Sequence, residues 1–437
     1  MTKTVSVPCS SVTGLRRPSR HPSRSRRAGP GRVPMSRPTT SHETGTAVRG
    51  ESPPGLVRVA VSAFFFVLGL GFGSWVVRIP DVQHELGISK GSLGAALLAV
   101  TVGSLVGMPL AGWLGTRMDG AWVLRVSGAV LAVSIALPPY ATDWWTLALA
   151  LIVVGVGNGA LGVAMNVQGS LVERTLDRPV MSSFHGVFSI GGLVGSLGGG
   201  AVASAGIGPR AHLSATAAIL LCLTLAAGSR LLSSPPDRDN AAPVLVRPTK
   251  TALIGGTVAF CVLFGEGAVS DWSAVYLKND LSAAALAGMG YAAFAGAMAA
   301  GRLAGDRLAA AVGPRRLVIY GGCIGTVGIT SVVLIGHPLA TVVGFGLMGL
   351  GLSVVYPQVV SAAGATGGKD TAPDTAIAAV STIGYFGFLI GPPAIGGLAQ
   401  MTSLRWAFLL VALCSVLIIP LAGRALTATA PGRDASG

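Results

Sequence analysis

The sequence predicts an all-α integral membrane protein in which twelve transmembrane helices form two pseudo-symmetric six-helix bundles. Three observations support this prediction: the composition, a series of apolar segments of membrane-spanning length, and a repeat that relates the two halves of the chain. Of the 437 residues, 51% are hydrophobic and 11% are charged, whereas a soluble protein carries about 25% charged residues. The mean hydropathy of +0.67 is typical of a chain that lies largely in lipid.

Twelve apolar segments have roughly the 20 residues that a helix needs to cross a bilayer. They are 57–77, 92–113, 121–139, 144–167, 180–203, 211–232, 251–276, 285–304, 315–335, 338–361, 376–399 and 403–423. The longest polar interruption follows the sixth segment, at 229–250. The predicted organisation is a disordered basic cytoplasmic tail at 1–55, an N-terminal bundle at 56–232, a cytoplasmic linker at 233–250, a C-terminal bundle at 251–425 and a cytoplasmic tail at 426–437.

The positions of the basic residues predict the orientation. If both termini lie in the cytoplasm, the outside segments carry only five of the 31 Lys and Arg, namely Arg78, Lys90, Arg210, Lys278 and Arg405. Basic residues concentrate on the cytoplasmic side of membrane proteins. We therefore expect a multi-pass protein of the inner (plasma) membrane with both termini in the cytoplasm.

The net charge of +14 comes mostly from residues 1–55, which hold ten Lys or Arg and two acids. Their Arg, Ser and Pro content predicts disorder and a modest attraction to anionic lipid headgroups. Alternatively, translation starts at Met35 and the upstream residues are not made. Neither interpretation indicates a nucleic-acid partner. The expected partners are a small-molecule solute and the lipid bilayer, and the expected state is a monomer.

Sequence motifs for most enzyme classes are absent. The chain has no GxxxxGK[ST] nucleotide loop, no HExxH and no strand-following GxSxG. Its five cysteines are scattered singly, without disulfide or metal-ligand spacing. We therefore expect no enzymatic activity, no metal and no cofactor, and a proton gradient as the energy source.

The two halves of the chain resemble each other. GMPLAGWLGTR, ending at Arg117, aligns with GAMAAGRLAGDR, ending at Arg307, at an offset of 190 residues. At the same offset, MNVQ at 165–168 lies over VYPQ at 355–358. A ladder of glycines in the fifth segment recurs in the eleventh at an offset of 196. Together these matches indicate duplicated halves, which in transporters rock about a site near the middle of the membrane.

From 57 to about 425 the chain resembles the major facilitator superfamily. The loop signature of that family, broadly GxLaDRxG, is similar to GWLGTRMDG at 112–120 and GRLAGDRL at 301–308. In the family this Asp and Arg help to hold the cytoplasmic gate closed. The resemblance implies that role for Asp306 and Arg307, and for Arg117 with Thr116 in the place of the acid.

Three further stretches resemble one branch of that superfamily, the sugar-like carriers around the rhizopine-catabolism membrane protein. They are FGSWVVRIPDVQHELGIS at 72–89, MNVQGSLVERTLDRPVMSSFHGVFSIGG at 165–192, and EGAVSDWSAVYL at 266–277. The resemblance implies a carrier and leaves its solute open.

Two acids lie in the seventh predicted span, and a charge at that depth is costly unless it faces protein or water. Glu266 lies about 22 Å from the start of the span, on one helical face with Ser270, and Asp271 is rotated from it by about 140°. For Glu266 the hypothesis is binding of the coupling proton or of the solute, and the alternative is a structural contact. For Asp271 we favour a structural role, as an ion pair with Arg78 at the outer end of the first span.

Several other polar and aromatic residues in the spans are candidates for solute contact. Arg78 either binds an anionic or hydroxylated solute or extends its guanidinium to the interface. Asn158 either contacts the solute or another helix. We expect Asn166, Gln168 and His185 to form a structural network, with a proton role for His185 as the alternative.

Aromatic side chains could stack on a ring of the solute. The candidates are Trp75, Trp272, Tyr276 and Tyr356, with anchoring at the membrane interface as the alternative for Trp272 and Tyr276. Pro357, between Tyr356 and Gln358, predicts a bend in the tenth span. Gln358 adds a further amide at that bend.

The sequence therefore predicts a secondary active transporter of a small polar, sugar- or polyol-like solute. It would work by alternating access as a proton-coupled symporter. The alternatives are a proton-driven exporter of amphipathic compounds, or a membrane receptor or scaffold that does not transport.

Overall fold

The computed structural model describes residues 53–178, 180–233, 249–366 and 373–426. Within them, twelve helical segments are long and apolar enough to cross a membrane, so the predicted fold class is confirmed. Nearly all of the predicted N-terminal tail, most of the linker and the C-terminal tail lie outside the described residues.

The N-terminal half supplies six spans. The elements are α1 (Pro54–Leu86), α2 (Lys90–Gly115), α3 (Gly120–Ser134), the short 3₁₀ helix η1 (Pro138–Tyr140), α4 (Trp144–Leu176), α5 (Met181–Ser204) and α6 (Pro209–Gly228). Local chemistry sets their ends. Gly87 ends α1 in the left-handed conformation, with φ of 62°, and the Ser89 side chain then accepts a hydrogen bond from the Ser92 N–H to begin α2.

The C-terminal half supplies the other six. The elements are α7 (Lys250–Val275), a π-helical turn η2 (Tyr276–Asp280), a 3₁₀ turn η3 (Ala284–Leu286), α8 (Ala287–Val312), α9 (Pro314–Ile335), α10 (Pro338–Leu352), α11 (Val355–Thr366), α12 (Pro373–Met401) and α13 (Leu404–Leu426). A single span contains both α10 and α11. The break between them comes at Ser353 and Val354. It fits the predicted bend, because Pro357 has no N–H for the Ser353 carbonyl and its ring crowds that group.

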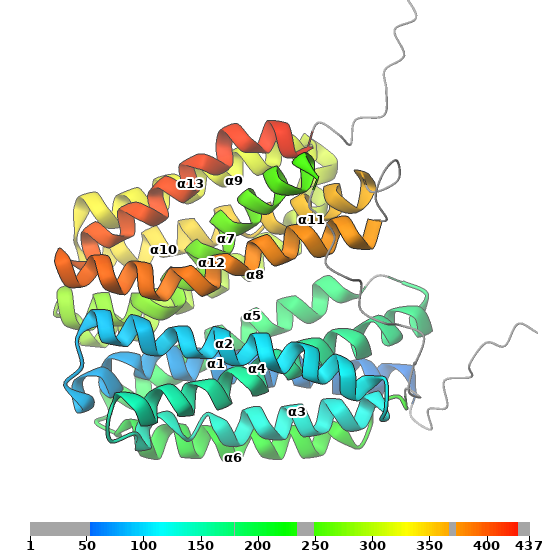
Figure 1. Cartoon of the computed structure of the whole chain (residues 1–437), viewed down its shortest axis with the longest axis horizontal. Helices are drawn as coiled ribbons and strands as arrows, with labels where there is room; N and C mark the ends of the chain where they lie inside the picture. Colours follow the sequence, from blue (N-terminus) through cyan, green and yellow to red (C-terminus); the bar gives the residue numbers. More distant parts are fainter. Residues whose placement is uncertain (1–52, 179, 234–248, 367–372, 427–437) are drawn as a thin grey trace, which may run out of the picture. The chain divides into compact units, whose positions relative to one another are not determined.

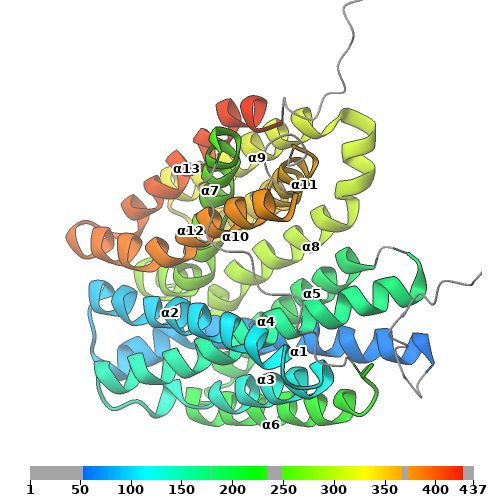
Figure 2. The same cartoon turned by 45° about the vertical axis from the view of Figure 1, so that its right-hand side comes forward.

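Packing groups the helices by half. In the N-terminal half α1 packs on α5 and α6, and α2 packs on α4; in the C-terminal half α7 packs on α12 and α13, and α8 packs on α10. Figures 1 and 2 show α1–α6 on one side and α7–α13 on the other. The halves meet where α2 packs on α12, α5 on α8 and α1 on α7. These contacts place the candidate residues of α7 and α8 beside the other half.

The closest approaches between the halves depend on glycine. A Cβ on Gly94 of α2 would lie 2.5 Å from the carbonyl oxygen of Pro392 in α12, and one on Gly288 of α8 would lie 2.6 Å from that of Ser196 in α5. Both distances are shorter than a real Cβ tolerates. Small residues therefore let these helices touch backbone to backbone, as is common in membrane proteins.

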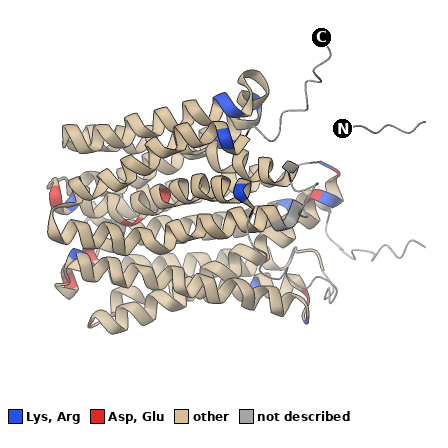
Figure 3. Cartoon of the chain, turned by 45° about the horizontal axis from the view of Figure 1, so that its top comes forward, with Lys and Arg blue, Asp and Glu red and all other residues tan. Residues whose placement is uncertain are grey.

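Charged residues lie mostly at the ends of the helices, as Figure 3 shows. Aromatic residues of α7 and η2 do not follow the predicted interfacial pattern. Trp272 and Tyr276 are 0% and 1% exposed, and Tyr276 packs edge-on against Phe408. Interfacial anchoring is therefore wrong for both, because they lie in the contact between α7 and its neighbours.

Candidate functional site

Glu266 of α7 lies beside Arg302 of α8. Their Oε2 and Nη2 atoms are 3.9 Å apart, and the two side chains are 19% and 21% exposed. At that distance the groups attract each other but do not form a hydrogen bond. Since α7 begins at Lys250, Glu266 is about 24 Å along it and lies deep within the span. The pair thus presents opposite charges, both partly accessible, in the interior of the helical assembly.

Arg302 was not among the residues singled out from the sequence. Its Nη1 donates a 3.4 Å hydrogen bond to the Ser189 hydroxyl of α5, so the guanidinium bridges the two halves. A signal was present, because a charged residue inside a predicted span usually faces protein or water and needs a partner. The family signature at 301–308 drew attention instead to the residues that follow it.

Two tyrosines lie within electrostatic range of the pair. Tyr291 lies close enough to Glu266 and Arg302 for their charges to act on its hydroxyl. Its ring packs edge-on against Phe72 of α1, with centroids 5.7 Å apart. Tyr385 of α12 is likewise within electrostatic range of Glu266, and is 36% exposed. The surroundings combine charge, hydroxyls and flat apolar surfaces.

The expected network of Asn166, Gln168 and His185 is not formed. Asn166 donates to the Gly162 carbonyl one turn back in its own helix, and Gln168 donates to the Leu232 carbonyl at 3.0 Å. His185 instead packs edge-on against Phe65. The predicted network is wrong because the three side chains project from their helices at different angles and so meet different neighbours.

Three other candidates have local partners. Asn158 donates a 3.2 Å hydrogen bond to the Ser104 hydroxyl, linking α4 to α2. Ser270 is buried and donates to the Gly267 carbonyl of its own helix. Tyr356 donates to the Ser381 hydroxyl at 3.3 Å, linking α11 to α12. Asn158 and Tyr356 are partly exposed, so both remain available to a solute, as does the partly exposed Gln358.

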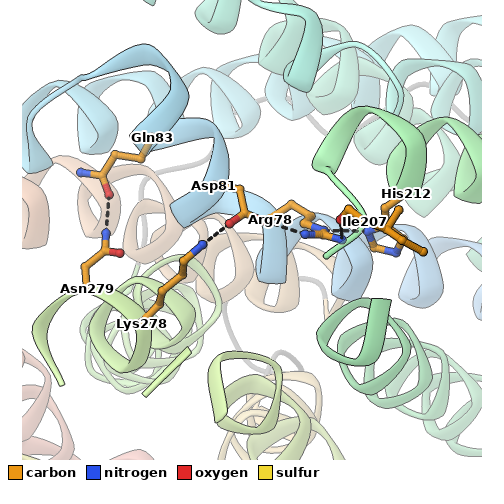
Figure 4. Close-up of polar contacts among 7 residues, drawn as sticks. All are labelled: Arg78, Asp81, Gln83, Ile207, His212, Lys278 and Asn279. Atoms are coloured by element: carbon orange, nitrogen blue, oxygen red, sulfur yellow. Dashed lines mark hydrogen bonds and ion pairs between the residues drawn. The ribbon is translucent and has the colours of Figure 1, made fainter. Parts of the chain in front are cut away.

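Arg78 is buried, with an exposed fraction of 2%. Its guanidinium donates to Nδ1 of His212 at 3.0 Å, to Asp81 at 2.7 Å and to the Ile207 carbonyl at 2.8 Å (Figure 4). Snorkelling to the interface is therefore wrong for Arg78. The neighbouring candidate Trp75 is also buried, at 4%. Neither side chain is placed to meet a solute in this conformation.

Three polar contacts join the halves at the end that carries η2. Lys278 pairs with Asp81, Lys90 pairs with Asp280 at 2.7 Å, and Asn279 donates to Gln83 at 3.2 Å (Figure 4 shows the first and third). We name these six residues the η2 latch. Within the described ranges, the other hydrogen bonds between the N-terminal and C-terminal halves lie either near the η2 end or near the middle of the membrane. The halves are thus fastened at the η2 end.

Asp271 is partly buried in α7, one and a half turns beyond Glu266. It makes no hydrogen bond or ion pair with any residue in the described part of the chain. The expected pair with Arg78 is wrong, because Asp81 lies one turn along the same helix and takes that guanidinium. Asp271 is therefore an acid within a span without a fixed partner among those residues.

Comparison with known proteins agrees with this architecture. The model of the Major Facilitator Superfamily matches residues 60–307 and 255–437. The chain belongs to the major facilitator superfamily. An uncharacterised MFS-type transporter of Yersinia pestis is 37% identical over 377 residues, covering 86% of this chain and 97% of that protein. The membrane protein MosC of Rhizobium meliloti is 28% identical over 395 residues, covering 88% and 96%. The predicted resemblance to the superfamily and to this branch is confirmed.

Solved structures share this fold. The nucleoside transporter NupG superposes with a TM-score of 0.65 at 12% identity, covering 85% of this chain and 99% of that one. A bacterial homologue of the human lysosomal transporter Spinster, in an inward-facing and occupied conformation, gives 0.69 at 14% identity, covering 85% and 96%. The Yersinia pestis relative and both solved proteins are named as transporters or as a transporter homologue, in keeping with a family of transporters.

The loops that carry the superfamily signature lie at the end opposite η2. Arg117 is exposed and places its guanidinium 4.0 Å from the centre of the Trp113 ring in its own half. Arg307 is exposed as well, and the side chain of Asp306 lies outside the described residues. Asp119, which follows Thr116, caps α3 by accepting from the Ala121 N–H and pairs with the Ser233 hydroxyl. These contacts hold loops within one half.

Proposed function

We propose that this protein is a secondary active transporter that carries a small polar solute across the inner membrane by alternating access, coupled to protons. The observation that carries the proposal is the Glu266–Arg302 pair. Its two side chains are each about one-fifth exposed inside the twelve-helix assembly, at 3.9 Å. Charged groups at such depth are costly to keep and mark solute or ion pathways in membrane proteins.

The chemistry around the pair favours a hydroxylated solute of the sugar or polyol kind. A carboxylate accepts hydrogen bonds from hydroxyls, and a guanidinium donates several in a fixed plane. Tyr385, within electrostatic range of Glu266 and 36% exposed, offers a ring face and a hydroxyl nearby. Because the pair is longer than a hydrogen bond, a solute hydroxyl can insert between the two groups without breaking one.

The placement of the contacts between the halves supports alternating access. The η2 latch fastens one end, and the ribbons of α5 and α8 diverge toward the other end in Figure 2. With both termini in the cytoplasm, as the distribution of Lys and Arg predicts, the latch lies outside and the site is reached from the cytoplasm. Breaking the latch would then open the site to the outside, in the manner of transporters built from repeats.

The test is uptake by the purified full chain in proteoliposomes. The probes are labelled D-glucose, D-ribose and D-mannitol, each measured by counterflow, in which labelled solute exchanges for unlabelled solute inside. We expect Glu266→Gln and Arg302→Gln each to abolish counterflow of the solute that wild type carries. Glu85→Gln is the matched control, because Glu85 is exposed at the end of α1.

Two results would contradict the proposal. Counterflow that survives both substitutions would show that the pair does not bind the solute. Expulsion of amphipathic dyes, with no movement of the three sugars and polyols, would favour the exporter instead.

A further inference from the structure

Glu266 and Asp271 lie in one helix but in different surroundings. Glu266 has the guanidinium of Arg302 at 3.9 Å, whereas Asp271 has no ion-pair or hydrogen-bond partner among the described residues. An ionised carboxylate that is removed from water without a partner is strongly disfavoured, and such a group takes up a proton instead. The positive charge of Arg302 stabilises the ionised form of Glu266, and no such charge among the described residues stabilises the ionised form of Asp271.

Each element packed against α7 brings its own ionisable groups toward Asp271. From α8, Tyr291 lies within electrostatic range. From α1, Arg78 and Asp81 are nearest the same end, but they are already paired with each other. Lys278, two turns further along the chain, is engaged with Asp81. The cations of these elements that lie nearest Asp271 along the chain thus have other partners: Arg78 and Lys278 with Asp81, and Arg302 with Glu266.

The other helices that contact α7 add no closer charge. Among the described side chains of α12, Tyr385 is ionisable and lies within electrostatic range of Glu266. In α13 Arg405 is held at the η2 end by the carbonyls of Val333 and Leu334. In α11 Tyr356 bonds to Ser381. Asp271 is the acid of α7 whose charge the described surroundings leave uncompensated.

A second observation concerns the turn that follows Asp271. The indole N–H of Trp272 and the hydroxyls of Ser273 and Tyr276 are buried and have no hydrogen-bond partner among the described residues. Buried polar groups are nearly always paired, so three orphans within five residues are unusual. They lie in the turn between Asp271 and the η2 latch and face different helices: Trp272 lies beside Gly396 of α12 and Ser273 beside Gly290 of α8, and Tyr276 packs on Phe408 of α13.

We propose that Asp271 is the carboxylate that carries the coupling proton, while Glu266 and Arg302 bind the solute. The inference rests on the proposed transport function. A proton passes from water at the η2 end to a carboxylate oxygen of Asp271 when the latch is open. Trp272, Ser273 and Tyr276 leave unpaired polar atoms in the turn that separates Asp271 from the latch.

Protonation makes conformational change possible because it removes the charge. The neutral Asp271 side chain packs between the closed halves at little cost, whereas its ionised form favours the open, hydrated arrangement. After closure at the η2 end, the same proton leaves Asp271 for water on the other side. One proton therefore crosses with each cycle, and no bond other than O–H is made or broken.

The first test reads the protonation of Asp271 without any solute. Infrared spectra of the reconstituted full chain are recorded near neutral pH, where exposed carboxyls are ionised. We expect wild type and Glu266→Gln to show the stretching band of a protonated carboxyl, and Asp271→Asn to lack it. Asp271→Glu should restore the band at a shifted position. Its persistence in Asp271→Asn, or its loss in Glu266→Gln alone, would overturn the assignment.

The second test separates solute binding from coupling, with labelled D-glucose, D-ribose and D-mannitol as probes. We expect Asp271→Asn to retain counterflow but to lose accumulation driven by an imposed proton gradient. Glu266→Gln should lose both. Gradient-driven accumulation by Asp271→Asn at the wild-type level would overturn the proposal, as would loss of its counterflow while the variant stays folded. If wild type moves none of these probes, the proposed solute class fails, and the infrared band alone decides the protonation of Asp271.

Discussion

Asp81 and Lys278 form an ion pair that joins α1 to η2 and so fastens one half of the protein to the other. The same carboxylate also accepts a 2.7 Å hydrogen bond from Arg78, one turn back in its own helix. Arg78 is in turn fixed by His212 and by the Ile207 carbonyl. Contacts within the N-terminal half therefore fix the Asp81 carboxylate in the position where it pairs with Lys278 of the C-terminal half.

Removal of the Lys278 ammonium should favour separation of the two halves at the η2 end. The side chains of Lys278 and Asp81 are 34% and 14% exposed, so solvent screens the pair in part. Its loss in Lys278→Ala should cost about 1 kcal/mol, which changes a population ratio about fivefold. Spin labels at Glu85 and Met401, exposed at this end of the two halves, should report longer distances in a larger fraction of molecules.

The matched variant exchanges the two charges. Asp81→Lys with Lys278→Asp restores an ion pair across the halves, although it places the new lysine beside Arg78. We expect the double variant to recover part of the short-distance population. Identical distance distributions in wild type and Lys278→Ala would show that the pair does not hold this end closed.

Arg78 should matter more for stability than for solute binding. Arg78→Ala leaves the Asp81 carboxylate, the His212 ring nitrogen and the Ile207 carbonyl without their common donor. Breaking a buried ion pair from one side costs up to about 3–5 kcal/mol, and the Lys278 ammonium that still pairs with Asp81 reduces that cost. Thermal unfolding of the purified protein in detergent should show a marked fall in melting temperature.

A less connected arginine serves as the control for Arg78. Arg125 is exposed and donates a hydrogen bond to the Gly228 carbonyl, so Arg125→Ala should lower the melting temperature much less. Arg78→Lys tests the geometry, since one ammonium cannot reproduce the planar set of donors. Equal melting temperatures for Arg78→Ala and Arg125→Ala would contradict the role assigned to the buried guanidinium.

The membrane architecture was predictable because hydrophobicity and length are local properties of the chain. Each predicted span corresponds to a helical segment of the structure, and Pro357 predicted the break before α11 from its own chemistry. The repeat between halves was also visible, since short matches at a constant offset survive in sequence. These inferences need no knowledge of which helices touch.

Partners of individual side chains were harder to predict, because they depend on helix rotation and on contacts far apart in the chain. Arg302 lies 36 residues after Glu266, and only the packing of α7 on α8 brings them together. Arg78 was assigned to Asp271, yet a closer acid, Asp81, lies three residues along the same helix face. Hydropathy identifies a polar residue in a span but not the neighbour that it faces.

The turn before α4 should respond to acid. The backbone N–H of Thr146 bonds the Asp143 carboxylate and, with smaller hydrogen-bond contributions, holds its pKa below the usual value of 3.8. An acid with a lowered pKa in the folded state contributes stability above its unfolded pKa and loses it as the pH falls through the folded value. Asp143→Ala should therefore lower the melting temperature at neutral pH, and the difference should narrow below about pH 4.

Asp143→Asn is the control for this carboxylate. Asparagine also caps helices but does not titrate, so the variant should keep most of the melting temperature at neutral pH. A difference between wild type and Asp143→Ala that stays constant across the acidic range would show that the carboxylate charge does not contribute.

The glycine contacts between the halves should control how tightly the η2 end closes. A methyl group on Gly94 would meet the Pro392 carbonyl oxygen at 2.5 Å, and backbone atoms cannot move aside as a flexible side chain can. Overpacking of this kind costs about 1–3 kcal/mol, and about 1.4 kcal/mol changes an equilibrium tenfold. Because the clash exists only while α2 and α12 touch, Gly94→Ala should favour the state open at the η2 end.

Spin-label distances between Glu85 and Met401 measure this shift. Gly198→Ala in α5, where a Cβ meets nothing within 4 Å, should leave these distances unchanged. Equal distances in both variants would mean that α2 and α12 separate too little during the cycle for their contact to set the balance.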